Sequence, residues 1–292
     1  MGKQKRSENT YQKINTIFKR DVNNIIMPYD GFVEPTLEYL RNCKFDCEEK
    51  VDGTNIRIEV IPEYENYVEV VDNITAEDSM IPYKVTWSVS YKGKTDNAEV
   101  PKKLMKYLQE TYTEEVILNA LGLKKEMSVD DDFTIEKGWV IENNSWGHEL
   151  DTSKIPSKYT IYGEGYGAGI QKCGGNYQLE QKLIGFDVKV GDIYLLRENR
   201  DEIFNKMNCP IVPFVGQFTI DEAIEYVKKG FISNISENRE FLAEGLVCRT
   251  PMGLKTRRGE RIIFKVKTCD WNKYFAKYGT YDKVDQQENT HY

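Results

Sequence analysis

Hydrophobic and polar positions alternate with a period of two over much of this chain, a pattern typical of strands with one buried face. The alternation predicts strands at 54–61 and 84–91, with an acidic loop around 72–79 between them. The same pattern recurs in six later runs, at 133–141, 159–163, 181–188, 192–196, 245–249 and 261–267. Gly191 separates the third and fourth of these runs, which predicts a hairpin turn at that residue.

Helical spacing is rarer. The stretch from Pro101 to Leu123 is the clearest helix, because proline suits a first helical position and apolar residues recur three and four apart. Shorter helices are predicted at 35–42 and 220–229, and residues 11–27 read as an extended arm. Strands with short loops and few intervening helices favour an α+β fold, with largely antiparallel sheets and flanking helices, over a doubly wound parallel sheet.

Composition places the chain among ordinary globular proteins. Of its 292 residues, 40% are hydrophobic and 30% charged, which is enough to bury a core. The formal net charge of −7 argues against a surface that coats nucleic acid broadly, although a local basic site is compatible with it. No apolar run approaches the roughly 18 residues of a membrane helix, and the polar N-terminus lacks the apolar segment of a secretory signal. We therefore expect a cytoplasmic protein.

The numbers and spacing of the cysteines and histidines limit which metal sites and catalytic groups the chain can form. The six cysteines contain no CxxC pair and no zinc-site spacing, so we expect reduced thiols. Only two histidines occur, His148 and His291, and the second is next to the last residue. Nucleophilic catalysis with a histidine base would therefore depend on His148 alone, and lysine, carboxylate or metal chemistry is favoured.

One lysine stands out among acidic and polar neighbours. The segment FDCEEKVDGTN, residues 45–55, places Lys50 on a polar turn that leads into a predicted strand. Such a lysine is usually a solvated surface charge, and it can also be a nucleophile at the mouth of a pocket. The rest of the chain has to distinguish between these two interpretations.

Glycines frame a second candidate. The segment YGEGYGAG, residues 162–169, fits the dinucleotide pattern G-x-G-x-x-A, but that motif needs a helix directly after it. The adjacent glycines of IQKCGGNYQ make a helix there unfavourable, so we reject the dinucleotide interpretation. Glu164 remains as a carboxylate between glycines, which let a ligand approach the backbone closely.

Two further segments carry charge at strand ends. Glu244 directly precedes a predicted strand, and Lys265 and Lys267 lie two apart in another, so both face the same side. Two ammonium groups on one face repel each other unless an anion lies between them. For this pair alone, a solvated outer face is an equally good interpretation.

Taken in order, EKVDGTN, YGEGYGAGIQ, IGFDVKV, EGLVCR and FKVKT resemble the motifs of covalent nucleotidyltransferases, the ATP-dependent polynucleotide ligases and mRNA-capping guanylyltransferases. Within this group the chain is most similar to the RNA ligase 2 type and its phage-encoded relatives. The five segments span residues 49 to 268, most of the chain. The resemblance implies a nucleotidyltransferase (adenylation) domain over 31–292, with residues 1–30 as an N-terminal arm packed on it.

The resemblance also implies a role for each matching residue. Lys50 would carry the covalent AMP. Lysine must lose its proton to attack phosphorus, and neighbouring ammonium groups and partial burial favour that loss. Lys265 and Lys267 would supply such groups while neutralising the α-phosphate. Glu244 would hold Mg²⁺ or Mn²⁺, and Glu164 would bind the ribose hydroxyls or a metal ion.

The remaining implied residues contact the nucleotide. Asp52, Gly53 and Asn55 complete the first motif. The side chains next to the base would be Glu49 and the stacking aromatic Phe186. Lys94, in GKTDNAEVP, stands where the family usually has arginine, and it offers a point charge in place of a planar fork.

The implied activity is that of an ATP-dependent RNA ligase. Lys50 takes AMP from ATP and passes it to a 5′-phosphate, and a 3′-hydroxyl then displaces AMP and joins the strands. About 25 residues follow KVKT, where DNA ligases and capping enzymes usually carry an OB-fold, so we expect no C-terminal OB-fold. Three alternatives stay open: a DNA ligase, a capping enzyme using GTP, and a nucleotide-binding module without turnover. The expected partner is RNA, bound by a monomer, and whether a separate end-healing or substrate-binding protein takes part stays open.

Overall fold

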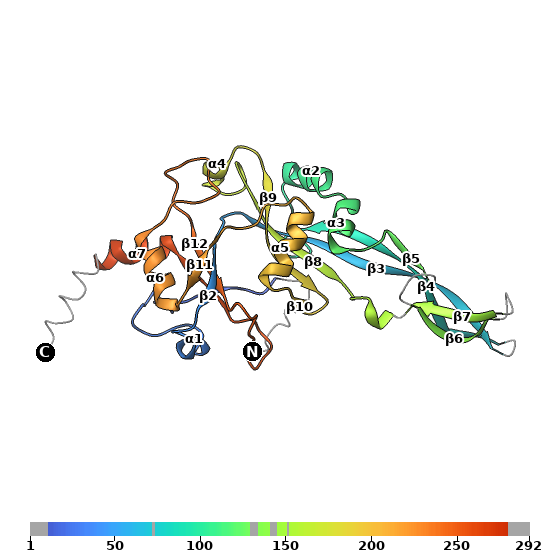
Figure 1. Ribbon diagram of the computed structural model, residues 1–292. Coiled ribbons are helices and arrows are strands. Elements are labelled where there is room, and N and C mark those ends of the chain that lie inside the picture. The colour runs from blue at the N-terminus through green and yellow to red at the C-terminus, as the bar shows by residue number, and fades with distance from the viewer. Residues whose placement is uncertain (1–10, 72–73, 129–133, 141–144, 151, 280–292) are drawn as a thin grey trace. The chain divides into compact units, whose positions relative to one another are not determined.

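A computed structural model describes residues 11–71, 74–128, 134–140, 145–150 and 152–279. The chain divides into two compact units, each built from separate stretches of sequence. Unit one comprises Met1–Thr54, Glu164–Ile184 and Ile211–Tyr292, and unit two comprises Asn55–Gly163 and Gly185–Pro210. Both contain antiparallel strands and helices, so the predicted α+β class is confirmed (Figure 1).

Unit one is built on a five-stranded sheet in the order β1-β13-β12-β2-β11. Its strands are β1 (Asn15–Thr16), β2 (Phe45–Glu49), β11 (Phe214–Phe218), β12 (Gly245–Arg249) and β13 (Ile263–Lys267). All neighbours are antiparallel except β1, which pairs in parallel with β13. The predicted strands at 245–249 and 261–267 are confirmed as a directly paired β12 and β13.

Strand β2 corrects one expectation. We read FDCEE as part of a polar turn, but these residues form a buried strand of the sheet. The neighbouring β-strands supply partners for two of its carboxylates. Gln217 donates to Asp46 at 2.8 Å, and Arg249 forms an ion pair with Glu48 at 2.9 Å. Buried carboxylates are tolerated where such partners exist, and these partners lie far away in sequence.

The helices of unit one are α1 (Thr36–Tyr39), α4 (Gly174–Tyr177), α6 (Ile220–Lys229) and α7 (Thr268–Tyr278). Helix α6 confirms the prediction at 220–229, and it begins with a capping box in which Thr219 and Glu222 exchange hydrogen bonds. The short helix α4 opens with the two glycines that we expected to prevent a helix. It begins only at Gly174, so no helix directly follows YGEGYGAG.

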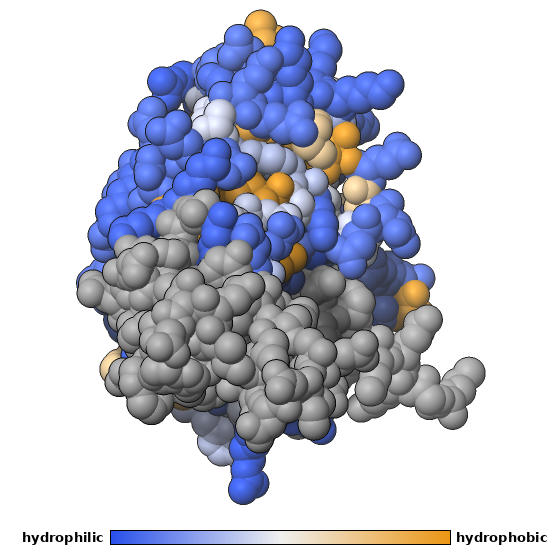
Figure 2. Space-filling view, turned by 90° about the vertical axis from the view of Figure 1, so that its right-hand side faces the viewer, coloured by the Kyte–Doolittle hydropathy of each residue, from blue (hydrophilic) through white to orange (hydrophobic). Residues whose placement is uncertain are grey.

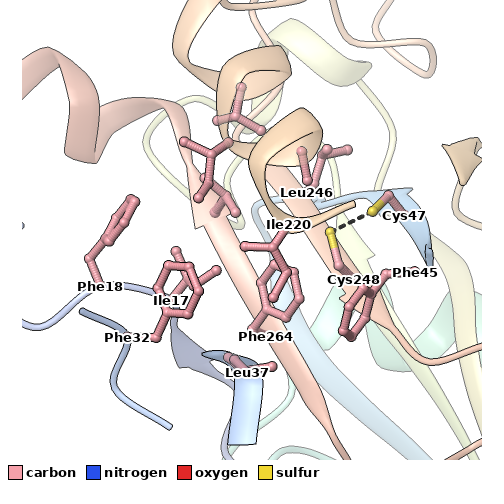
Figure 3. Close-up of a cluster of buried hydrophobic side chains, with 14 of the residues drawn as sticks. Ile17, Phe18, Phe32, Leu37, Phe45, Cys47, Ile220, Leu246, Cys248 and Phe264 are labelled. Atoms are coloured by element: carbon pink, nitrogen blue, oxygen red, sulfur yellow. Dashed lines mark hydrogen bonds between the residues drawn. The ribbon is translucent and has the colours of Figure 1, made fainter. Parts of the chain in front are cut away.

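Helix α6 packs on the sheet of unit one and closes its hydrophobic core (Figure 1). In the core, Ile220 of α6 lies among Phe45, Leu246 and Phe264 of three strands (Figure 3). The rings of Phe45 and Phe264 meet edge to face, with centroids 5.2 Å apart. The N-terminal segment contributes Ile17 and Phe18 to the same core.

Unit two contains a six-stranded sheet in the order β10-β9-β8-β3-β4-β5 and a separate pair, β6 and β7. The strands are β3 (Thr54–Val71), β4 (Ile74–Lys92), β5 (Glu126–Ser128), β6 (Thr134–Val140), β7 (Ser145–Leu150), β8 (Tyr159–Tyr166), β9 (Lys182–Val190) and β10 (Ile193–Tyr194). Strands β8 and β9 each include residues of both units. The predicted hairpin at Gly191 is confirmed, since this residue has φ +54° between paired strands β9 and β10.

Strands β3 and β4 are longer than predicted. We expected a loop around 72–79, but β4 already begins at Ile74, which pairs with Val71. The pairing is irregular in this stretch, because the register shifts between Val68, which pairs with Met80, and Val70, which pairs with Thr75. Residues 72–73 lie outside the described residues.

The predicted helix from Pro101 to Leu123 is two helices, α2 (Lys102–Thr111) and α3 (Glu114–Leu121). Thr113 starts the second one, since its side chain accepts a hydrogen bond from the Val116 amide. Unit two also contains α5 (Arg197–Lys206) and the 3₁₀ helix η1 (Thr152–Lys154).

The surface seen in Figure 2 is largely hydrophilic, and the described helices are short or polar. In the view of Figure 2, hydrophilic residues cover most of the coloured surface, and hydrophobic residues form small separate patches. Among the residues searched, those that the structure describes, no helix has the length and apolar character needed to cross a membrane.

Candidate active site

Lys50 lies directly after strand β2, at the start of the turn Lys50–Gly53 that leads into β3. The sheet fixes its backbone, because the Lys50 amide donates to the Gly245 carbonyl at 2.9 Å. Its side chain is 21% exposed, so the ammonium group is neither fully solvated nor sealed in the core. Lys50 is therefore not a fully solvated surface charge, and its role as a nucleophile stays a prediction.

Glu244 bridges Lys50 and Lys267. One of its carboxylate oxygens lies 2.7 Å from Lys50 Nζ, and the other lies 2.8 Å from Lys267 Nζ. Strand pairing explains this meeting, since Gly245 pairs with Lys267 while Glu244 O accepts from the Thr268 amide at 2.9 Å. Three predicted site residues from separate stretches of sequence therefore meet at one carboxylate.

The two lysines of β13 differ in what surrounds them. Burial lowers the pKa of Lys267, but its hydrogen bond to Glu244 and the charge of that carboxylate outweigh burial and hold the pKa above its ordinary value. Lys267 is therefore protonated at neutral pH. Lys265 lies on the same side of β13 and is also partly buried. The two buried neighbours in the strand, Phe264 and Val266, point to the core instead.

Glu164 and Asp52 add carboxyl groups to this cluster. Burial raises the pKa of Glu164 to about 7, with smaller contributions from the charges of Glu244 and Asp52, while Lys50 opposes the shift. Burial also raises the pKa of Asp52, and Glu244 again adds to the effect. Titratable groups with opposed influences, gathered around a lysine, are characteristic of functional sites.

Gly53 is a glycine because two backbones touch there. A Cβ at this position would lie 2.2 Å from the Gly165 carbonyl oxygen and 2.9 Å from Glu164 Cγ. No side chain fits in that space, so the turn rests directly on strand β8. This contact keeps Glu164 and the turn of Lys50 together.

Glu49 has its carboxylate engaged within unit one. One oxygen accepts from the Ser233 hydroxyl and the other from the Asn234 amide at 2.8 Å, and the residue is 1% exposed. These bonds tie β2 to the segment that leads to Glu244. A nucleotide contact by Glu49 stays a prediction.

The other predicted residues, Asn55, Lys94 and Phe186, belong to unit two. The Asn55 side-chain oxygen is buried, and it has no hydrogen-bond partner in the described part of the chain. Lys94 is exposed in the turn after β4. The Phe186 ring is stacked on Tyr162, with centroids 6.4 Å apart and an interplanar angle of 21°.

Sequence reasoning missed three residues around these motifs. Arg57 is buried in unit two, where it donates to the Gly93 carbonyl at 2.8 Å and to Asp96 at 2.7 Å. It thereby holds the GKTDN turn. In unit one, Tyr177 accepts from the Asp52 amide at 3.1 Å, and Gln171 donates to the Gly53 carbonyl at 2.9 Å. Nothing local in the sequence signals these contacts.

The described residues contain few side chains placed to act together as metal ligands. In that part of the chain, no group of three or more His, Cys, Asp or Glu side chains is arranged to hold a metal ion. A magnesium ion bound through one or two carboxylates and substrate phosphates needs no such group. His148 lies in β7, and its side chain is outside the described residues.

Some solved structures are similar to this chain. A search of curated proteins found no match. Among solved structures, an apo mutant of the Naegleria gruberi RNA ligase is 15% identical with a TM-score of 0.46, over 90% of this chain and 58% of that chain. A mutant of the same ligase with ATP and Mn is 16% identical with a TM-score of 0.47, over 93% of this chain and 62% of that chain.

This chain thus spans less than two thirds of the length of those ligase chains. The sequence pattern of the RNA ligase family matches residues 44–267, which include Lys50, Glu164, Glu244 and both lysines of β13. That match covers more than half of the chain. The chain belongs to the RNA ligase family.

Proposed function

We propose that this chain is an ATP-dependent RNA ligase that works through a covalent AMP on Lys50. The observation that carries the proposal is the bridge in which Glu244 holds both Lys50 and Lys267 at hydrogen-bonding distance. Membership of the RNA ligase family supports the same chemistry. We also propose 31–292 as the adenylation domain, with 1–30 as its arm.

The donor set of unit one suits a nucleoside triphosphate with its metal ion. Lys265 and Lys267 would neutralise the α-phosphate, and Glu164 and Glu244 would hold Mg²⁺ or Mn²⁺. Both oxygens of Glu244 are occupied by lysines, so metal binding would replace one of these partners. When bound, the ion offsets the negative charge that develops on the transferring phosphoryl group.

In the first step the Lys50 nitrogen attacks the α-phosphorus of ATP. A P–N bond forms, the bond to the β,γ-phosphates breaks, and pyrophosphate leaves. Lys50 must give up a proton for this attack. As long as Lys50 keeps its contact with Glu244 and the metal ion replaces Lys267, the Glu244 carboxylate lies within hydrogen-bonding reach at 2.7 Å to receive it.

The later steps join RNA. A 5′-phosphate oxygen attacks the phosphorus of the AMP on Lys50, which breaks the P–N bond and leaves AMP on the RNA end. A 3′-hydroxyl then attacks the 5′-phosphate and AMP departs. We propose Asp52 and Gly53 as parts of the turn that presents Lys50. The proposed nucleotide contacts are Glu49, Asn55, Lys94 and Phe186.

The test is a set of four nicked duplexes that differ only in ribose or deoxyribose on each side of the nick, assayed at matched salt with ATP and Mg²⁺. We expect sealing of the all-RNA nick and a sharp loss when deoxynucleotides replace the 3′-hydroxyl side, since the 2′-hydroxyl distinguishes RNA from DNA. Equal sealing of an all-DNA nick would instead support a DNA ligase. A requirement for GTP would indicate a capping enzyme.

A further inference from the structure

The turn that carries Lys50 is held by a second segment of unit one. The Asp52 amide donates to the Tyr177 hydroxyl at 3.1 Å. The Gln171 side chain donates to the Gly53 carbonyl at 2.9 Å, and both of these partners come from the stretch that follows strand β8. The turn therefore has two anchors besides its own strand.

Tyr177 is itself rigidly placed. It is 0% exposed, and its ring makes edge-to-face contacts with Tyr166 at 5.9 Å and Phe241 at 5.1 Å. Its carbonyl accepts from the Glu237 amide at 2.9 Å. Packing and backbone bonds thus set the position of the hydroxyl independently of Asp52.

The bond to Asp52 reaches Lys50 through one peptide group. The Asp52 N–H and the Val51 C=O belong to the same planar unit, so a partner that fixes one also orients the other. The Val51 carbonyl accepts from Lys50 Nζ at 3.3 Å. Tyr177 therefore holds one side of a peptide plane whose other side contacts the proposed nucleophile.

The hydroxyl is suited to this task. Burial raises the pKa of Tyr177, and the charges of Glu244, Asp52 and Glu49 add to the effect, whereas the Asp52 amide opposes it. The side chain is therefore neutral throughout the working pH range. A neutral hydroxyl accepts from the Asp52 amide without adding charge next to Lys50.

We propose that Tyr177 is a positioning residue for the nucleophile, acting on Lys50 through the peptide between Val51 and Asp52. The inference rests on the proposed function, because it concerns the attack of Lys50 on ATP. Loss of the Tyr177 hydroxyl should therefore affect the three steps of ligation differently. Only transfer of AMP to Lys50 needs this nucleophile, whereas sealing of RNA that already carries AMP on its 5′-phosphate does not.

The test is Tyr177→Phe, which removes the hydroxyl and keeps the ring. At saturating ATP, formation of the Lys50 adduct should slow about tenfold, the rate equivalent of one ordinary hydrogen bond. The KM for ATP and the sealing of pre-adenylylated RNA should stay within about twofold. Tyr226→Phe is the matched control, because this ring of α6 packs between Phe218 and Phe231 in the same unit.

A second measurement is independent of activity. Amide hydrogen exchange of the peptide that contains residues 51–53 should be faster in Tyr177→Phe than in the wild type and in the control. Unchanged adduct formation or unchanged exchange would overturn the inference. Equal loss of adduct formation and of pre-adenylylated sealing would also overturn it, because that pattern indicates a general structural role. Failure of the wild type to form any adduct would count against the proposed function instead.

Discussion

Replacing Glu164 by glutamine isolates the energetic cost of keeping a carboxylate at this site. The amide has nearly the shape of the acid and cannot ionise. In the folded protein, burial raises the pKa of Glu164 from its ordinary value of 4.5 to about 7. The variant should therefore differ from the wild type in how its stability depends on pH.

The size of the expected change in stability follows from the ordinary and the raised pKa of Glu164. Their difference, 7 minus 4.5, is about 2.5, and at 1.36 kcal/mol for each pH unit this is about 3 kcal/mol. The folded state binds the proton more tightly than the unfolded state. The stabilising contribution of the protonated acid is therefore full below pH 4.5 and is lost as the pH rises to about 7. Above that pH the wild type bears the cost of a partly buried carboxylate.

The assay is urea unfolding at pH 5, 6, 7 and 8, with EDTA and without nucleotide. The free energy of unfolding of Glu164→Gln, relative to the wild type, should rise by up to about 3 kcal/mol between the lowest and highest pH. Glu240→Gln, at an exposed position of unit one, is the control and should show no such trend. Parallel profiles for Glu164→Gln and wild type would refute the reasoning. The opposite trend would show that Lys50 stabilises the carboxylate more than burial destabilises it.

Two further predictions concern packing. Gly53→Ala places a methyl group 2.2 Å from the Gly165 carbonyl, so it should lower the free energy of unfolding by about 1–3 kcal/mol in urea and reduce adduct formation. Gly175→Ala, where a Cβ meets only ordinary contacts, is the control, and equal stability of the two variants would contradict the account. In native protein, iodoacetamide should label the three exposed cysteines and spare Cys47, Cys209 and Cys248, since burial raises the pKa of the Cys209 thiol to about 11 and that of Cys248 well above its ordinary value. Mass spectrometry after brief labelling should show three modifications, and early labelling of Cys248 would refute the described core.

The sequence pattern predicts an element correctly where neighbouring residues alone determine its structure. The strands β12 and β13, the turn at Gly191 and the helix α6 are visible in the sequence as alternation, a turn glycine and amphipathic spacing. The ordered motifs also point to Lys50, Glu244 and Lys267, and the structure places both lysines within hydrogen-bonding distance of Glu244. Antiparallel pairing of β12 with β13 then brings Glu244 next to Lys267.

Long-range partners account for what was missed. The acidic residues of β2 are typical of a turn. They can lie in a buried strand because Gln217 and Arg249, about 170 and 200 residues away in the chain, bind two of its carboxylates. The anchor of the Lys50 turn is equally remote, since Asp52 and Tyr177 are 125 residues apart. Such contacts have no local signal, so a single sequence indicates the charged residues of a motif more readily than their remote hydrogen-bond partners.

The proposed mechanism requires that Lys50 becomes covalently adenylylated. The most direct measurement is intact mass spectrometry after incubation with ATP and Mg²⁺, followed by peptide mapping under mild, non-acidic conditions that preserve a P–N bond. We expect one added AMP on Lys50, which pyrophosphate removes and which is missing in Lys50→Ala. No adduct with any nucleotide, or an adduct that maps to another residue and persists in Lys50→Ala, would contradict it.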